Sequence, residues 1–397
     1  MRHVVVCAGL GILLAGAAQA VGRSQLCPKP EGSGTHSRPR PPVAPSLVLY
    51  HNFSWEELLV RVVSIRGGGI AACCCSHLLR RAGFGVADDK LDRPKLPAVM
   101  LSETSQKLLQ DLFQQNKLFA GVHRIRRRAV LWGEQAEAVM LPHYALVVSE
   151  ATLLNRIQAE AVPGGGAEQD VAEWEILAAR THPSAASRPF LEHAFGTRMA
   201  LALPVMLKTD AASDACWIES QPEGWLFLLP SDERSGWLLA VGVQPERILA
   251  GSRLIGPQIT ATGSEAGSFA SYPRIAEPLC APGWLACGSA ALGFDPLCGD
   301  GAGHAVREAI LGSAVICAAS QGGDVKSLVA HYEARLVAGF RRHLEVCRQF
   351  YEAGRCGPWW DQQIADLNRG LEWCSQRLAR SPGFRYRLNG FALEPVR

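Results

Sequence analysis

The chain has 397 residues, 48% of them hydrophobic, so it can bury a large core spread over two or three domains. Its formal net charge is +3 with 19% charged residues, which excludes a general affinity for nucleic acid. After residue 20 no apolar run of about 18 residues occurs, so neither a membrane-spanning segment nor a membrane partner is expected in the folded part.

The first 55 residues predict a signal-like and disordered extension. An apolar run from Val4 to Ala17 precedes Ala18-Gln19-Ala20, a pattern typical of a secretory signal. Residues 21–46 are rich in Pro, Ser, Gly and Arg, which predicts a disordered linker. No twin arginine precedes the apolar run, so export of a prefolded protein is not indicated. We therefore expect a cytoplasmic protein, with export as the alternative.

A first glycine motif, residues 67–72, follows a predicted strand at residues 62–65. Gly67 permits a tight turn, and Gly69 lets the backbone approach a pyrophosphate group. Ala72, in the third position, allows close packing of the helix expected over residues 73–82. The pattern predicts a dinucleotide-binding strand–helix–strand unit.

The second strand of this unit is expected near residues 84–86, and an acid at its end binds a ribose in such folds. Asp89, or its neighbour Asp88, lies about 20 residues from the glycines. Strict spacing points instead to Lys90, so the register is imperfect.

The cysteine pattern favours free thiols. Cys73, Cys74 and Cys75 are consecutive on the predicted helix, and no Cys-x-x-Cys pair occurs among the 13 cysteines. We expect these residues to pack as small hydrophobic side chains in a reducing compartment, without a metal.

Residues 186–275 predict an antiparallel sheet, because apolar segments at 199–206, 224–230 and 237–243 are separated by polar turns. Trp225 and Phe227 alternate along the middle segment. Two interpretations remain open: these side chains line a substrate cavity, or they are ordinary core residues of a strand.

A second glycine motif, residues 285–303, is the most informative stretch of the chain. A short apolar strand ends at Gly288, and a glycine cluster opens a helix expected over residues 305–318. Backbone amides at such a junction, together with the positive end of a helix, can approach an electron-rich ligand. The Gly-Lys-Ser/Thr of a phosphate loop is missing, so a ring that holds transient negative charge, such as reduced flavin, fits better.

The two glycine motifs, in this order, resemble those of FAD-dependent monooxygenases and flavin-dependent halogenases. The resemblance implies an α/β fold, with a Rossmann-like FAD-binding domain of the hydroxybenzoate-hydroxylase type, an inserted antiparallel β-sheet substrate domain and a C-terminal helical region. Ser289 stands where this family has the Asp that binds the ribityl chain. The residues of the second motif implied in cofactor binding are Gly288, Ser289, Asp295, Pro296, Gly299, Gly301 and Gly303.

The basic run at residues 123–128 has two interpretations. Its side chains can form a solvated strand edge, or one arginine, for which we take Arg128, can contact the FAD pyrophosphate as the resemblance implies.

Segment 224–230 also resembles the Gly-Trp-x-Trp-x-Ile-Pro signature of halogenases, with Phe227 for the second Trp and Leu229 for Ile. Halogenation in that family needs a lysine from a preceding segment, and residues 118–207 contain none. Hydroxylation is therefore favoured.

Residues 324–353 predict an amphipathic helix with Asp324 as its N-cap, because apolar side chains recur every three or four residues from Leu328 to Tyr351. This stripe is expected to pack against the flavin domain. Trp359 and Trp360 then follow in a turn. We interpret them as a hydrophobic cap on this helix, with an anchor for a partner protein as the alternative.

From about residue 60 onward the chain resembles one subgroup, the flavin-dependent monooxygenase of the quinohemoprotein amine dehydrogenase maturation system. The resemblance is carried by residues 67–83, 95–101, 283–288 and 356–360. It implies FAD, with NADH or NADPH as reductant and O2 as cosubstrate. The implied reaction is hydroxylation of a tryptophan in the small subunit of the dehydrogenase, on the way to cysteine tryptophylquinone.

The expected organisation is an extension over 1–55, an FAD-binding domain over 56–185 and 276–323, a substrate sheet over 186–275 and a helical region over 324–397. No catalytic base stands out, and His143, Tyr144 and Asp300 are the candidates. The alternatives to the implied function are a halogenase or small-aromatic hydroxylase, and a non-catalytic flavin-binding protein.

Overall fold

The computed structural model describes residues 61–91, 93–161, 172–180, 190–264, 267–298 and 300–396. The predicted extension over 1–55 and the glycine at position 299 lie outside these ranges. Residues 61–397 form one compact unit, whose largest hydrophobic core contains side chains from both of its large sheets.

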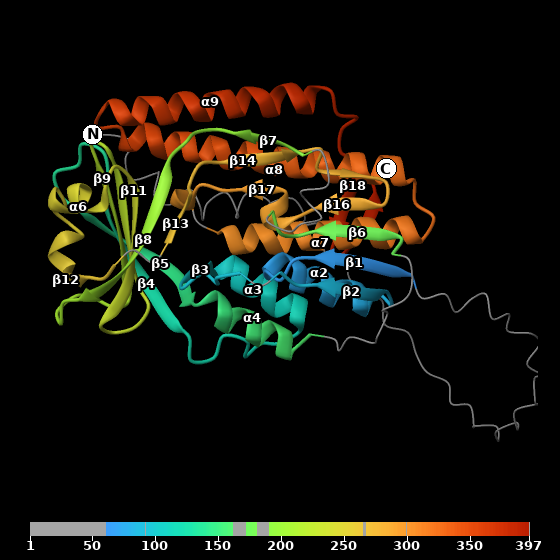
Figure 1. Cartoon of the computed structure of the whole chain (residues 1–397), viewed down its shortest axis with the longest axis horizontal. Coiled ribbons are helices and arrows are strands. Elements are labelled where there is room, and N and C mark those ends of the chain that lie inside the picture. The colour runs from blue at the N-terminus through green and yellow to red at the C-terminus, as the bar shows by residue number, and fades with distance from the viewer. Residues whose placement is uncertain are drawn as a thin grey trace, which may run out of the picture. The chain divides into compact units, whose positions relative to one another are not determined.

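A five-stranded sheet, in the order β15-β16-β6-β1-β2, is built from strands far apart in the sequence (Figure 1). Four of its strands are parallel neighbours, and β15 at the edge is antiparallel to β16. Parallel neighbours require crossover connections, and a helix provides the one between β1 and β2. The strands are β1 Val62–Arg66, β2 Gly85–Asp89, β6 Trp174–Leu177, β15 Cys280–Ala281 and β16 Trp284–Ala286.

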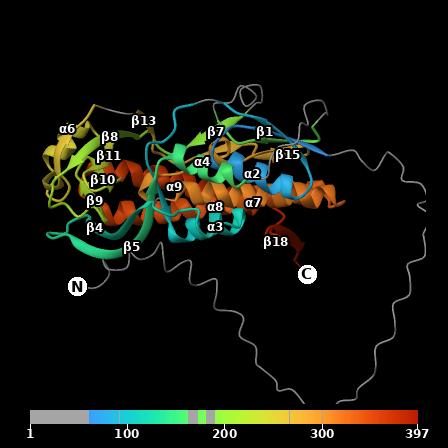
Figure 2. The ribbon, with the colours of Figure 1, turned by 90° about the horizontal axis from the view of Figure 1, so that it is seen from below.

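Helix α2 (Ile70–Arg81) is that crossover, and it confirms the unit predicted from the first glycine motif. The three consecutive cysteines at 73–75 are all buried on it, as expected for small hydrophobic side chains. Helix α2 packs against α7 (Gly301–Ser320), as Figure 2 shows from below.

Of the helices in the described ranges, only α7 is long and apolar enough to cross a bilayer, and 67% of that stretch is buried inside the protein. It is a core helix.

A nine-stranded sheet follows the order β12-β8-β11-β10-β9-β4-β5-β3, and β13 also pairs with β8. Its neighbours are antiparallel except for β4 and β9. The three segments predicted to form an antiparallel sheet are β8, β10 and β11. The strands are β3 Val99–Ser102, β4 His123–Leu131, β5 Val139–Val148, β8 Met199–Leu207, β9 Ala215–Gln221, β10 Gly224–Pro230, β11 Ser235–Gly242, β12 Ile259–Thr262 and β13 Gly267–Ala270.

The expected boundary at residue 185 does not separate the two sheets. Strands β3, β4 and β5 lie in the segment expected for the FAD domain, yet they belong to the nine-stranded sheet. The cause is the parallel pairing of β4 with β9, which joins strands from both sides of the boundary. The two sheets therefore interleave along the chain.

Two strands carry the chain between the sheets. β7 (Leu191–Ala194) leads from the five-stranded to the nine-stranded sheet, and β14 (Arg274–Glu277) leads back and pairs with it. β14 also pairs with β17 (Leu292–Gly293), so a small third sheet forms at this crossing. The remaining short elements are α3 Glu103–Phe113, α4 Glu150–Ala159, α6 Pro245–Ala250, and the 3-10 turns η2 Gly256–Gln258, η3 Gly288–Ala290 and η4 Pro296–Cys298.

The C-terminal region begins with α8 (Val325–Gly354), which confirms the predicted amphipathic helix. Asp324 accepts the backbone N–H of Lys326 at 3.2 Å, and the apolar stripe of the helix is buried. Helix α9 (Pro358–Ala379) packs along α8. The predicted C-terminal helical region is confirmed by α8 and α9, and a hairpin of β18 (Tyr386–Asn389) and β19 (Ala392–Pro395) follows them.

The partner-anchor interpretation of the two tryptophans fails for Trp360. Its side chain is fully buried, and its indole N–H donates to the carbonyl of Gln221 at 2.9 Å. It also meets Trp132 edge to face, with ring centroids 5.4 Å apart. Trp360 therefore fixes the start of α9 against the nine-stranded sheet.

Candidate functional site

The carboxyl ends of β1, β6 and β16 meet at one edge of the five-stranded sheet, where open α/β sheets bind ligands. Gly67 leaves β1 with φ of +136°, a conformation that favours glycine. A Cβ atom at Gly67 would lie 3.0 Å from the Cβ of Ala179, so the turn also needs glycine for space. The backbone N–H of Gly67 donates to the carbonyl of Asp89 at 2.8 Å. This turn is the first half of the site.

The second half is the turn at Gly288, directly after β16. Gly288 has φ of +55°, and a Cβ there would lie 2.9 Å from the Cβ of Ala71 in the first turn of α2. The two glycine motifs, more than two hundred residues apart in the sequence, are therefore in direct contact. Ala72, the third position of the first motif, is buried beneath them.

Glu308 of α7 fixes the second turn, because its carboxylate accepts the backbone N–H of Gly288 at 2.7 Å. The other carboxylate oxygen, Oε1, is buried without a hydrogen-bond partner. Burial raises the pKa of Glu308 from 4.5 to about 8, and the hydrogen bond from Gly288 only partly offsets this. The sequence alone does not single out Glu308, because it is one of many glutamates and aspartates on predicted helices and belongs to no motif.

The predicted ribose acid, Asp89, lies at the exposed end of β2. Arg66, the last residue of β1, forms two ion pairs there. Its Nη1 lies 2.6 Å from Oδ2 of Asp89, and its Nε lies 3.2 Å from Oε1 of Glu175 in β6. Asp88 is bound instead by Arg80 at 2.7 Å. Asp89 is thus the acid at the ligand-binding edge, and a ribose would have to share it with Arg66.

Arg93, rather than Arg128, is the arginine that the structure brings beside Gly69. A Cβ at Gly69 would lie 3.4 Å from Nη2 of Arg93, and Arg93 donates to Glu150 at 3.0 Å. No motif marks Arg93 in the sequence, because it follows β2 in an irregular loop. Its guanidinium group can meet a pyrophosphate that approaches Gly69.

Arg128 lies in β4 of the nine-stranded sheet, half-buried, with Nη2 3.0 Å from Nε2 of His143. Burial and the charge of Arg128 lower the pKa of His143 to about 3, so this candidate base is neutral near pH 7. Tyr144, its neighbour, is 63% exposed. A pyrophosphate contact by Arg128 and a catalytic role for His143 or Tyr144 stay predictions.

Ser289 is exposed in the turn η3, and its carbonyl accepts Nη2 of Arg274 at 3.0 Å. A ribityl contact by the Ser289 side chain stays a prediction. Arg274 itself is held by Glu192 at 3.3 Å. The departure from the expected Asp is therefore a local change in an otherwise ordered turn.

The amino end of α7 carries the glycine cluster of the second motif. Asp300 adopts φ of +67°, and its carboxylate accepts the hydroxyl of Ser105 and pairs with Arg307 at 2.9 Å. A Cβ at Gly303 would collide with this carboxylate at 2.3 Å, so glycine is needed there. Gly301 is exposed with open space around it. Asp300 stands at the N-cap position of α7 without a capping hydrogen bond from its side chain, and its role as a base stays a prediction.

Asp295 is fully buried, and its partners show that it is part of the protein's framework. Its carboxylate pairs with the buried Arg198 and accepts the hydroxyl of Tyr351 at 2.9 Å. Its backbone N–H donates to Nε2 of His343 at 2.9 Å. This network joins the loop carrying Pro296 to α8, so Asp295 supports the second motif from behind.

Trp225 belongs to the same network. It is 1% exposed, and its indole N–H donates to the hydroxyl of Tyr351 at 3.2 Å. Trp225 is therefore a core residue of β10. Phe227, on the same strand, is half-buried. A substrate contact by either residue stays a prediction.

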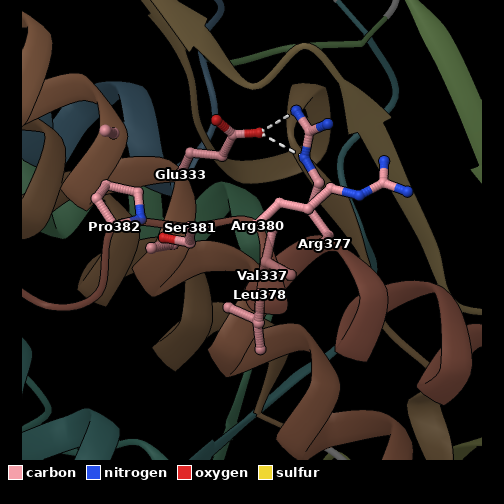
Figure 3. Close-up of a pocket in the computed structure, with 9 residues that line it drawn as sticks. Glu333, Val337, Arg377, Leu378, Arg380, Ser381 and Pro382 are labelled. Carbon is pink, nitrogen blue, oxygen red and sulfur yellow. Dashed lines mark hydrogen bonds and ion pairs between the residues drawn. The ribbon is translucent and has the colours of Figure 1, made fainter.

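A cavity of about 190 Å³ lies between α8 and α9 (Figure 3). Glu333 and Arg377 are paired across it, and Arg380 and Ser381 complete its polar wall. Its volume is below the roughly 300 Å³ at which small-molecule sites begin. It is also formed by other elements than the glycine motifs, so it is not the dinucleotide site.

No known protein-family profile and no curated protein sequence matches the chain. Solved structures do. The chain is similar to the peptidyl tryptophan dihydroxylase QhpG, with a TM-score of 0.62, 17% identity, and coverage of 85% of this chain and 86% of that one. It is similar to the flavin-dependent halogenase CmlS, with a TM-score of 0.60, 15% identity and coverage of 81% and 72%.

A third similar structure is the p-nitrophenol 4-monooxygenase PnpA from Pseudomonas putida DLL-E4, with a TM-score of 0.59, 13% identity and coverage of 81% and 97%. All three similarities cover more than four fifths of this chain. The chain has the fold of the FAD-dependent monooxygenases and halogenases.

Proposed function

We propose that this protein is an FAD-dependent monooxygenase that hydroxylates a tryptophan side chain within a polypeptide, using O2 and NADH or NADPH. The observation that carries the proposal is the contact of Gly288 with Ala71. This contact joins the two glycine motifs at one sheet edge, and the hydrogen bond from Gly288 to Glu308 links α7 to the same turn. Such an edge offers backbone amides to an anionic dinucleotide.

The chain's own residues have distinct tasks in this proposal. The turn at Gly67–Gly69 and the first amides of α2 bind the pyrophosphate, with Arg93 as counter-charge. The amino end of α7 at Gly301 stabilises negative charge on the ring system. FAD, when bound, would supply the activation of O2 for oxygen transfer to an electron-rich ring.

The rest of the fold serves orientation and exclusion of water. The buried network of Arg198, Asp295 and Tyr351 holds the loop of the second motif rigid against α8. In a rigid loop the backbone amides keep one orientation, so no free energy is spent on reorienting them during the reaction. The nine-stranded sheet would cover the substrate from the side opposite the dinucleotide.

The polypeptide substrate is supported by the similarity to QhpG, which covers most of both chains. We infer that the small subunit of a quinohemoprotein amine dehydrogenase is the partner, as its tryptophan becomes part of cysteine tryptophylquinone. A tryptophan in a protein gains orientation from contacts remote from its ring. Free tryptophan lacks these contacts and should react slowly or not at all.

The cofactor is tested by the absorbance spectrum of the purified protein, followed by extraction and identification of the flavin. Gly69→Val should abolish flavin binding while the protein still folds, because Gly69 has φ of −91° and only the side chains of Arg93 and Glu150 lie nearby. Gly339→Val in α8 is the matched control, since nothing lies within 4 Å of its added Cβ. A Gly69→Val protein with a full complement of FAD would refute the site.

The substrate is tested by mass spectrometry of the partly matured small subunit after incubation with the protein, NADH or NADPH, and O2. Addition of one or two oxygen atoms to a single tryptophan is expected. Efficient turnover of free tryptophan with an unchanged subunit would overturn the polypeptide proposal. Products that require chloride or bromide would instead identify a halogenase.

A further inference from the structure

Two cysteines meet where the second glycine motif contacts α8. Cys298 ends the turn η4 and Cys347 lies in the middle of α8, and their Sγ atoms are 3.2 Å apart. A disulfide bond needs about 2 Å between the sulfur atoms, so a small rotation of the two side chains would complete one. Such a bond would join the loop of the second motif covalently to α8.

The two thiols differ in their access to solvent. Cys347 is fully buried, whereas Cys298 is half-buried. An oxidant in solution therefore meets Cys298 first. Cys347 is the neighbouring thiol that resolves the product, and it does so slowly, because burial and the contact with Cys298 raise the pKa of Cys347 well above its ordinary value.

His343 is also part of this cluster, and its contacts favour a thiol pair over a metal site. The two Sγ atoms and a ring nitrogen of His343 lie within 4.8 Å of one another. Nε2 of His343 lies 3.3 Å from Sγ of Cys347, and it already accepts the backbone N–H of Asp295 at 2.9 Å, so a metal ion bound through Nε2 would displace this hydrogen bond. Binding a metal there would leave a buried N–H without a partner.

We propose that Cys298 and Cys347 are a dithiol pair that hydrogen peroxide oxidises to a disulfide. Peroxide oxidises the Cys298 thiol to a sulfenic acid and releases one water. The Cys347 thiol then attacks this sulfur, the S–S bond forms, and a second water leaves. Two thiols lose two electrons, and one peroxide is reduced to two waters.

The pair lies where peroxide would arise if the proposed function is correct, since reduced flavins that react with O2 without substrate release hydrogen peroxide. The disulfide itself does not depend on that function. Added peroxide therefore tests the pair even if the flavin proposal fails, and the flavin content of the sample reports on that proposal separately.

The chain offers a matched control pair. Cys75 and Cys287 have Sγ atoms 4.0 Å apart, but both residues are fully buried. The full-length purified protein is treated with increasing hydrogen peroxide, alkylated, digested and mapped by mass spectrometry with and without reductant. We expect one disulfide between the peptides of residues 298 and 347, with one peroxide consumed per bond, while Cys75 and Cys287 stay reduced.

Single variants separate the two steps. Cys347→Ser should leave a sulfenic acid on Cys298 that dimedone traps, and Cys298→Ser should form neither species. A wild-type protein that shows no 298–347 disulfide when its exposed methionines are already oxidised would overturn the proposal. A zinc ion bound to each chain would also overturn it, if native mass spectra of protein purified with zinc show this ion in the wild type and not in Cys347→Ser.

Discussion

At the scale of a single residue, Glu308 links the ligand-binding edge to pH. Its pKa in the folded protein is raised from 4.5 to about 8 by burial, so the folded state binds a proton that the unfolded state has lost. Stability falls with pH wherever the unfolded state binds fewer protons. The stabilising effect of the protonated carboxyl is therefore complete below pH 4.5 and is lost as pH rises through 8.

We expect the free energy of unfolding to fall between pH 5 and 8 with a component of about 1.4 kcal/mol per pH unit at the steepest. Glu308→Gln should remove this component, because glutamine does not titrate but can still accept the N–H of Gly288. Urea unfolding at several pH values measures it. Glu372→Gln, an exposed acid on α9, is the control and should leave the slope unchanged. Equal slopes in the wild type and Glu308→Gln would contradict the prediction.

At the scale of elements, the buried pair of Arg198 and Asp295 ties the turn η4 to the strand β8 and to α8. The two side chains are 1% and 0% exposed. Burial alone would lower the pKa of Arg198, but Tyr351 and the Asp295 carboxylate raise it above its ordinary value. Removing one partner leaves the other charge buried and uncompensated.

Arg198→Met should thus lower the free energy of unfolding by about 3–5 kcal/mol. Arg198→Met combined with Asp295→Leu should be less destabilising, since no unpaired charge remains. Arg387→Met in the exposed pair with Glu394 is the control and should be far less destabilising than Arg198→Met, because solvent screens an exposed ion pair. Thermal or urea unfolding measures all three. A double variant that is less stable than Arg198→Met would contradict this prediction. It would show that loss of the attraction within the pair, rather than the unpaired buried charge, accounts for most of the destabilisation.

The sequence predicted elements well where local pattern decides structure. The turn at Gly67, the strand β10 and the long helix α8 follow from glycine positions and from periods of two and 3.6 residues. It could not predict Arg93 beside Gly69, or Asp295 turned into the core, because both depend on which distant segments pack together. The strand β9 was missed for the same reason: its place is set by pairing with β4 and β10.

At the scale of the whole molecule, one core joins the two large sheets. It contains Val63 of the five-stranded sheet and Trp225 of the nine-stranded sheet. The described unit begins at Arg61, and its first strand, β1, begins at Val62.

We expect a protein that starts at His51 to unfold at the same thermal midpoint as the full chain and to hold the same amount of flavin. Scanning calorimetry and the absorbance spectrum measure the two properties. A chain that starts at Ile65 is the control, because it lacks most of β1 and should not fold. A lower midpoint in the protein starting at His51 would show that the first 50 residues contribute to the folded unit.

The order of strands in the parallel sheet has a consequence for protein synthesis. Strand β1 leaves the ribosome early, but its sheet lacks β16 until residues 284–286 have been translated. At about 5–20 residues per second, this interval is roughly 10–40 seconds. During that time apolar side chains such as Val63 and Leu79 have no complete core to enter. Nascent chains of this protein should therefore need a chaperone at the ribosome, and premature termination before β16 should yield products that aggregate or are degraded.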